Sequence, residues 1–259
     1  MTSAVWTQTA ELSRRSVVRT LRQPAQVVPS LTFPLFLLAI NAGGLDAATA
    51  IPGFPTDSYL TFALAVPFVQ SGIIAVTNSG ADLATDIETG FLDRLALTPM
   101  SGAALVAGQL AGIVALGVLQ ALVYLGVGLA AGAGLEAGLA GAFVLLALSV
   151  VITFGFGCIG VFAAFRLGDG EAVQGLFPVL FVTLFLSSMA LPRDLIEQDW
   201  FRTVATYNPV SYLIEGVRSL FIDGFDGEAL ALAFGCGLAI GALFLALAVT
   251  SLRTRLQRT

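Results

Sequence analysis

A few uncharged polar and aromatic side chains interrupt the long apolar runs of this sequence. Gln70 and Asn78 stand in one run, and Phe177, Phe181 and Phe185 recur every four residues in another. Polar groups in such surroundings are costly unless they face protein or water. The three rings on one helix face are one candidate for an aromatic wall that contacts a hydrophobic substrate. A phenylalanine stripe is also typical of a helix that only faces lipid or core.

Several kinds of chemistry are excluded by composition. The sequence contains no histidine, and all twelve of its basic residues are arginine. This excludes a Ser-His-Asp triad, an HExxH zinc site and a P-loop lysine. Cys158 and Cys236 lie far apart in apolar runs, which indicates buried free thiols rather than a metal site. The net charge of -5 argues against a nucleic-acid partner.

The elements that carry these residues are predicted to be membrane-spanning helices. Hydrophobic residues make up 57% of the 259 residues and charged residues 11%, which excludes a soluble globular protein. Six charge-free runs each exceed the ~20 residues that cross a bilayer as a helix. We therefore predict one all-α transmembrane domain over residues 1–259. Its spans are expected at about 26–45, 59–79, 104–131, 139–164, 172–191 and 229–251.

The arginines predict the orientation of these spans. Six crossings place both termini on one side, and nine of the twelve arginines fall on that side. By the positive-inside rule, both termini are expected in the cytoplasm and the protein in the inner (plasma) membrane. An alternative is that Arg14 and Arg15 begin a twin-arginine signal peptide. Pro29 and Pro34 inside the following apolar run argue against it.

Residues 5–22 are predicted to form an amphipathic helix. Trp6 lies on one face, and Arg15, Arg19 and Arg22 lie on the opposite one. Such a helix is expected to lie in the cytoplasmic interface with its arginines toward lipid phosphates. An ordinary positively charged flank is the alternative.

The segment 82–99 follows the second span and carries four acids and one arginine. Phe91, Leu92 and Leu95 make part of it apolar, and Pro99 ends any helix there. We predict a short amphipathic helix that fits a partner's groove or packs on the base of its own bundle.

On the outer side, residues 194–222 predict two short helices, at about 194–205 and 209–222. Asn208 is a good N-cap residue and Pro209 a good first-turn residue. Glu215 and Arg218 have the spacing for an ion pair on one helix face. We expect this outer cap to lie at the level of the lipid headgroups or to dip into the leaflet.

The order and spacing of these features resemble the permease subunits of type-2 ABC exporters, in particular the daunorubicin/doxorubicin-resistance permeases of actinobacteria. Three segments carry the resemblance: "RQP" at 22–24, "ETGFLDRLALTPMSG" at 88–102 and "NPVSYLIEGVRSLF" at 208–221. It extends over nearly the whole chain.

The resemblance implies roles for the non-spanning segments. Two permease chains, identical or similar, would pair, and each would dock one ABC ATPase subunit. The helix 5–22 would be an elbow, and 194–222 an outer lid containing Asn208, Pro209, Glu215 and Arg218. The coupling helix would lie within 82–99, with Asp86, Glu88, Phe91, Leu92, Leu95 and Pro99 toward the ATPase. No cofactor is expected on this chain, because ATP and Mg would bind to the partner ATPase.

The function expected from the resemblance is ATP-driven export of a hydrophobic or amphipathic substrate, drug or lipid-like, by a chain that is not itself an enzyme. The substrate would pass near Gln70, Asn78 and the phenylalanines of 177–185. Export of a polysaccharide or glycolipid by the same architecture is an alternative. A non-transporting membrane scaffold predicts no ATPase partner, and an ion-coupled carrier predicts gradient-driven uptake without ATP. The absence of an acid near the middle of any span argues against the carrier.

Overall fold

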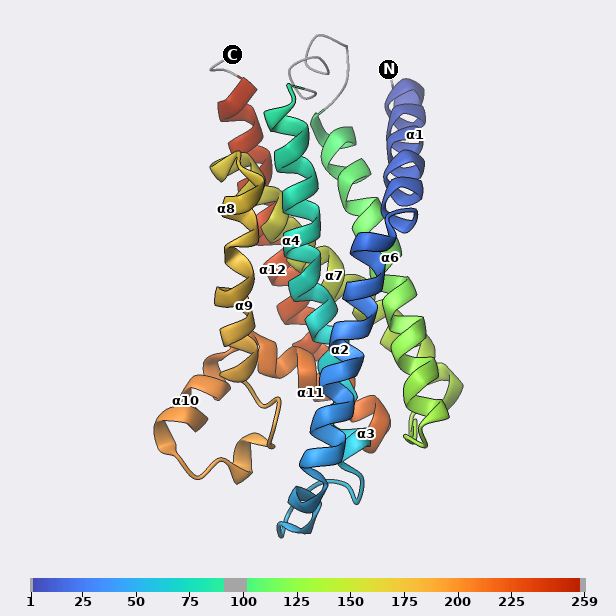
Figure 1. Ribbon diagram of the computed structural model, residues 1–259, viewed down its shortest axis with the longest axis vertical. Helices are drawn as coiled ribbons and strands as arrows, with labels where there is room; N and C mark the ends of the chain where they lie inside the picture. Colours follow the sequence, from blue (N-terminus) through green and yellow to red (C-terminus); the bar gives the residue numbers. More distant parts are fainter. Residues whose placement is uncertain (1, 91–101, 257–259) are drawn as a thin grey trace.

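The computed structural model describes residues 2–90 and 102–256, and within these ranges every regular element is a helix. The longest are α1 (Thr2–Leu21), α2 (Pro24–Gly44), α4 (Ala65–Glu88), α6 (Gly102–Ala130), α7 (Gly138–Leu167) and α12 (Gly227–Leu256). They run roughly along one common axis (Figure 1). The predicted all-helical fold is confirmed for this part of the chain.

Within the described ranges, five helical segments are long and apolar enough to cross a membrane. They are α2, the segment formed by α3 (Tyr59–Ala63) with α4, most of α6, α7 and most of α12. The start of α1, the end of α4 and the end of α12 lie at one end of the bundle, which we call the terminal end (Figure 1). We call the other the distal end. The protein is a multi-pass membrane protein, while the six-crossing layout stays a prediction.

The fifth predicted span differs from the expectation of a helix over 172–191. It consists of two helices, α8 (Gly170–Gln174) and α9 (Leu176–Phe185), and turns follow from residue 186. Sixteen residues rise only about 24 Å, which is less than the ~30 Å of a hydrocarbon core. The apolar run continues beyond Phe185, so composition alone does not end this helix.

The centre of the bundle is α4, packed against α7. Of its most apolar stretch, together with α3, 83% is buried, against 17% for α2. Glycine allows the close approach, since a Cβ atom on Gly80 would lie 2.8 Å from the carbonyl oxygen of Gly160. The Ser79 hydroxyl also donates to the carbonyl of Gly157 at 3.1 Å. This tight contact makes α4 and α7 the rigid core of the molecule.

The first helix packs along a neighbouring helix of the bundle. It lies alongside α6 rather than across the terminal end (Figure 1). Gly108 and Gly112 of α6 make room for it, because a Cβ atom on Gly112 would meet Ser16 and Thr20 of α1. The side of α1 that carries Leu12, Ser16 and Thr20 therefore packs on protein. Its location in the membrane interface stays a prediction.

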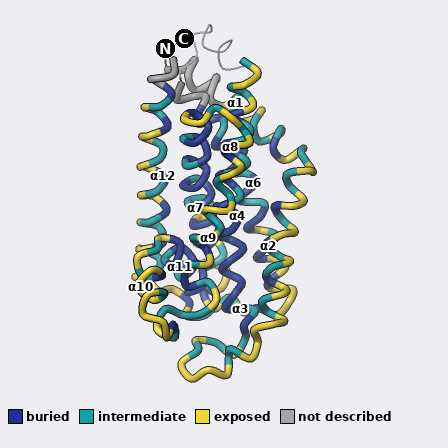
Figure 2. The backbone as a smooth tube through the Cα atoms, turned by 60° about the vertical axis from the view of Figure 1, so that its left-hand side comes forward, coloured by how far each residue is buried: buried dark blue, intermediate teal, exposed yellow. Residues whose placement is uncertain are grey.

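The distal end holds the shorter elements, which are η1 (Asp46–Ala50), α3, η2 (Arg193–Leu195), α10 (Asp199–Tyr207) and α11 (Pro209–Ile222). The predicted helix at 194–205 is replaced by η2 and α10. The helix predicted at 209–222 is present as α11, with Pro209 as its first residue. Figure 2 shows that α10 is largely exposed, whereas α11 is buried. Leu213, Val217 and Leu220 are each 0% exposed, so this face of α11 packs into the core of the chain.

Candidate functional site

Asn208 joins the end of α9 to the start of α11. Its Oδ1 accepts a hydrogen bond from the Val210 amide at 2.9 Å, which confirms the predicted N-cap. Its Nδ2 donates to the carbonyls of Thr183 at 2.6 Å and Leu186 at 2.9 Å. The last carbonyls of a helix have no partner within it. Asn208 therefore satisfies two of them and explains how α9 ends among apolar residues.

Arg218 ties three segments together from inside the core. Its Nε donates to the carbonyl of Phe62 at 3.1 Å, and its Nη2 donates to those of Ser188 at 3.0 Å and Met189 at 3.3 Å. The guanidinium also lies 3.5 Å from the centroid of the Phe62 ring. Arg218 is only 6% exposed. It thus holds the turn after α9 and the end of α3 against α11.

The predicted ion pair between Glu215 and Arg218 is not formed. Glu215 pairs with Arg193 of η2 instead, and Arg193 lies over the ring of Tyr212 at 4.7 Å. Arg218 points instead toward the backbone carbonyls of Ser188 and Met189 beyond α9. Two residues predicted for the outer lid, Glu215 and Arg218, therefore lie near each other but bind different partners. Glu215 binds Arg193, and Arg218 binds the turn after α9.

A charged cavity of about 510 Å³ opens beside these links at the distal end. Arg193, Arg202, Glu215, Arg218, Asp223 and Asp226 are among its lining residues. Burial, and then the neighbouring Asp226 carboxylate, raise the pKa of Asp223 above its ordinary value.

A second cavity, of about 450 Å³, lies between the N-terminal part of α2, α4 and α8–α9. We call it the amide cavity. Its lining residues are Gln26, Thr77, Asn78, Ala81, Gln174, Phe177 and Pro178. It brings together Asn78 and Phe177, two of the residues predicted for the substrate path. Gln26 was missed because a polar residue in the first turn of a span is ordinary.

Gln70 lies apart from the amide cavity. It lines a small void of about 10 Å³ together with Asn41, Tyr59 and Met189. Its Oε1 is buried without a hydrogen-bond partner. A void of this size is close to that of one water molecule, which would satisfy this oxygen. The structure therefore separates Gln70 from Asn78, although both belong to α4.

The phenylalanine stripe of α9 begins at the amide cavity and leads away from it. The rings of Phe177 and Phe181 have centroids 5.3 Å apart, and those of Phe181 and Phe185 5.2 Å apart. Phe33 of α2 meets Phe181 at 5.9 Å. Phe185 is half-exposed, at 52%. The stripe thus faces α2 at its centre and the surface of the chain at its distal end.

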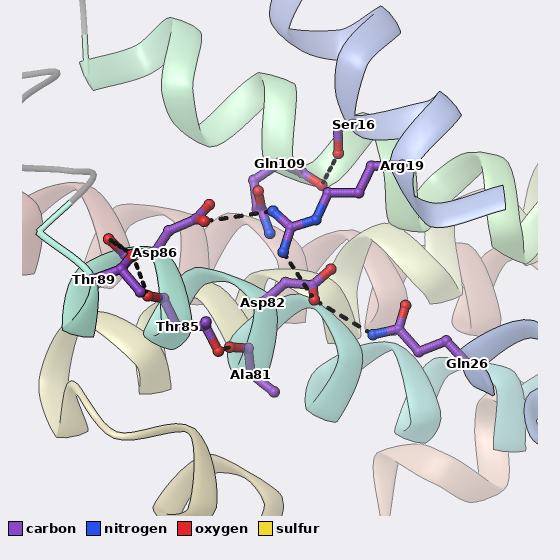
Figure 3. A network of polar contacts seen from close by, with 9 residues as sticks. All are labelled: Ser16, Arg19, Gln26, Ala81, Asp82, Thr85, Asp86, Thr89 and Gln109. Atoms are coloured by element: carbon purple, nitrogen blue, oxygen red, sulfur yellow. Dashed lines mark hydrogen bonds and ion pairs between the residues drawn. The ribbon is translucent and has the colours of Figure 1, made fainter. Parts of the chain in front are cut away.

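Arg19 links α1 to α4 near the terminal end. Its guanidinium lies 3.6 Å from Asp82 and 3.5 Å from Asp86, and Gln26 donates to Asp82 at 3.4 Å. Figure 3 shows Arg19 reaching from α1 to these two carboxylates. Arg19 therefore pairs with two acids of α4. The predicted approach of this arginine face to lipid phosphates stays a prediction.

Glu88 contacts α8 rather than pointing away from the bundle. Its Oε1 accepts a hydrogen bond from the Gly170 amide at 2.9 Å. Asp169 caps the same helix by accepting from Glu171 and Ala172. Since α8 leads into α9, the last turn of α4 is joined directly to the helix that lines the amide cavity.

Some of the predicted site residues lie outside the described part of the chain. Phe91, Leu92, Leu95 and Pro99 fall in the undescribed range 91–101, and the side chain of Trp6 is not described either. Arg15 and Arg22 are exposed on α1 and directly after it. The coupling role of 82–99 and the interfacial role of the first helix stay predictions.

The apolar helices define a multi-pass membrane protein, and its similarity to known proteins shows the family to which it belongs. Residues 7–222 match the ABC-2 type transporter family, to which this chain belongs. It is 30% identical over 220 residues to the daunorubicin resistance ABC transporter permease protein DrrB1 of Streptomyces coeruleorubidus. These residues cover 83% of this chain and 76% of that relative.

Two further relatives are ycf38 proteins that carry the name of a transport permease. The one from Porphyra purpurea is 27% identical and the one from Pyropia yezoensis 28% identical, each over 218 residues. Each alignment covers 81% of this chain and 72% of the relative. The resemblance noted from the sequence is confirmed, and the chain is a membrane permease subunit of an ABC transporter.

Proposed function

We propose that this permease exports a hydrophobic or amphipathic molecule, drug or lipid-like, from the cell. The observation that carries the proposal is the amide cavity with its adjoining phenylalanine stripe. The volume of the cavity falls in the range of about 300–1,000 Å³ that is typical of small-molecule sites, and the phenylalanine stripe supplies an apolar wall beside its polar lining. The daunorubicin resistance named in one relative supports a drug-like substrate.

The energy would come from two ABC ATPase subunits on separate chains, which bind ATP and Mg. The segment 82–99, with Asp86, Phe91, Leu92, Leu95 and Pro99, would dock in a groove of one ATPase. Glu88 would act differently from the first expectation, because it holds α8 and so passes a movement of this segment to α9.

On the distal side, α10 and α11 would form a lid over the exit. Asn208 and Arg218 fix the end of α9 under this lid, so that a movement of α9 also displaces α11. The charged cavity beside them lies where a substrate would leave. Both termini would lie in the cytoplasm, with the lid outside the plasma membrane.

The transporter would contain a second permease chain, identical or similar. The exposed apolar surface on α2 supports such pairing, since Val28, Phe36 and Ile40 are all more than half exposed. A surface of this kind is covered either by lipid or by another transmembrane chain.

Co-purification tests the proposal directly. The tagged permease is extracted from its own membranes, and a nucleotide-binding subunit is sought in the complex. We expect such a subunit, and an ATPase rate that rises with amphipathic drugs. A permease that binds no ATPase would favour the scaffold alternative, and stimulation only by glycolipid or polysaccharide would favour that class of cargo.

A further inference from the structure

We propose that the amide cavity selects an uncharged head group that both donates and accepts hydrogen bonds, such as the hydroxyls of a sugar or a carboxamide. The inference rests on the proposed function, because it names the substrate class of the same site. It is drawn from the side chains that line the cavity and from the atoms among them that lack a partner.

Two buried polar atoms at this cavity have no hydrogen-bond partner. One is the donor Nδ2 of Asn78, and the other is the acceptor Oε1 of Gln26. The identity of the Gln26 oxygen is fixed by its neighbour, since Nε2 is the atom that donates to Asp82 at 3.4 Å. An unsatisfied buried group destabilises a protein unless a ligand or water completes it. Both atoms are covered by protein in this conformation, so the lining residues hold one unused donor and one unused acceptor that rotation of the amides would expose to a ligand.

The two amides are able to turn toward a ligand. Both side chains line the cavity, and the terminal torsion of an amide is broad and easily rotated. Asp82 keeps its ion pair with Arg19 when the long contact from Gln26 is released. Thr77 and Gln174 add a hydroxyl and a third amide to the lining.

The charge of the lining separates the classes of head group. None of the residues that line the amide cavity is ionisable. An ammonium group only donates, so it would leave Nδ2 of Asn78 unpaired. A sulfate group only accepts, so it would leave Oε1 of Gln26 unpaired. A hydroxyl or a carboxamide satisfies both and carries no charge to be desolvated.

The other end of the ligand would be apolar. Phe177 lines the cavity and stacks on Phe181, which continues toward Phe185. The amides at one end and the rings at the other match an amphiphile. Its head group would lie in the amide cavity, beside the first turn of α9. An apolar chain along these rings would run toward the distal end.

Binding of four probes with the same twelve-carbon chain tests the selectivity. Dodecyl glucoside, dodecanamide, dodecylammonium and dodecyl sulfate are radiolabelled. Saturable binding to the full chain in phosphatidylcholine nanodiscs is then measured over that to empty nanodiscs. We expect the glucoside or the amide to bind at least about tenfold more tightly than either charged probe, the equivalent of one unpaired buried group. Equal affinity for a charged probe would overturn the inference.

Three variants connect this selectivity to the cavity. Asn78→Leu and Gln174→Leu should each weaken binding of the preferred neutral probe several-fold, whereas Asn78→Asp should shift the preference toward dodecylammonium. Gln109→Leu is the matched control, an amide of α6 outside the cavity, and should bind like the parent chain. Each variant is checked for monodisperse elution and an unchanged melting temperature. Unchanged binding in both folded leucine variants would place the ligand elsewhere.

The outcome is independent of the test of the proposed function. The binding assay contains only the permease, so it remains informative if no ATPase is found. Selective neutral binding without an ATPase partner would refute ATP-driven export and keep the site. An ATPase partner without selective binding would keep export and refute the head-group class.

Discussion

At the scale of single residues, Arg218 is one buried cation that donates hydrogen bonds to three backbone carbonyls. The carbonyls of Phe62, Ser188 and Met189 all depend on it, and the Phe62 ring covers its guanidinium. Arginine suits this position because its planar group offers several donors in fixed directions. No other standard side chain would reach all three carbonyls at once.

Replacing Arg218 should therefore be strongly destabilising. We expect Arg218→Met, which keeps the length but removes the donors, to lower the free energy of unfolding by about 3 kcal/mol or more. Arg218→Lys should recover only part of the loss, because an ammonium lacks the planar arrangement of donors. Denaturant titration of the purified chain in detergent measures both. Equal stability of the Met variant and the parent would show that water replaces the arginine.

Variants of Glu88 can separate two effects: binding of the ATPase subunit to the permease, and transmission of its movement to α8 and α9. Glu88→Ala removes the acceptor for the Gly170 amide. If its role is to hold α8, drug-stimulated ATPase activity should fall about fivefold, the equivalent of one ordinary hydrogen bond, while the ATPase still co-purifies.

Glu88→Gln is the matched control, since it keeps an acceptor oxygen and removes the charge. It should retain most of the stimulation. Loss of ATPase binding in both variants would instead mean that the carboxylate contacts the ATPase directly.

At the scale of elements, α9 and α1 depart most from their simple expectations. A short helix such as α9 is tolerated in an apolar environment only when its free carbonyls find donors. Asn208, the N-cap of α11, provides two of these donors, and Arg218 of α11 binds the turn that follows α9. The position of α1 depends on close packing instead of added donors. Gly108 and Gly112 have no side chains, so α1 can approach α6 closely.

The contact between α1 and α6 predicts contrasting effects of adding one methyl group. A Cβ atom on Gly112 would overlap the Ser16 hydroxyl and lie 2.7 Å from the Thr20 hydroxyl oxygen, whereas one on Gly126 would meet nothing within 4 Å. Gly112→Ala should lower stability by about 1–3 kcal/mol through overpacking and expose α1 to protease. Gly126→Ala should be neutral or stabilising, by up to about 1 kcal/mol, because alanine favours a helix.

Denaturant titration and limited proteolysis within residues 10–21 check this pair. Similar behaviour of the two variants would indicate that α1 does not pack on α6 in the membrane, as an interfacial helix would not.

At the scale of the whole molecule, the two ends of the bundle should face opposite sides of the membrane. Thr89 follows α4 at the terminal end, and Asp57 precedes α3 at the distal end, both in exposed positions. In a chain with Cys158 and Cys236 replaced, an impermeant maleimide should label Asp57→Cys in intact cells. It should label Thr89→Cys only after the membrane is opened. Labelling of Thr89→Cys from outside would invert the orientation and refute cytoplasmic coupling.

The sequence by itself determined the membrane class, the all-helical fold of the described residues and the family. These follow from local properties, since a long charge-free run has few alternatives to a helix in lipid. The N-cap at Asn208 was also predictable, because a capping residue acts on its immediate neighbours.

Only the tertiary structure decided the partners of Arg218, Glu88 and Arg19, the early end of α9 and the packing of α1. Each depends on groups far away in sequence, such as the Phe62 carbonyl or the Gly170 amide. Which donor reaches which unpaired acceptor is set by how the helices pack. The local sequence around each residue therefore does not predict its partner.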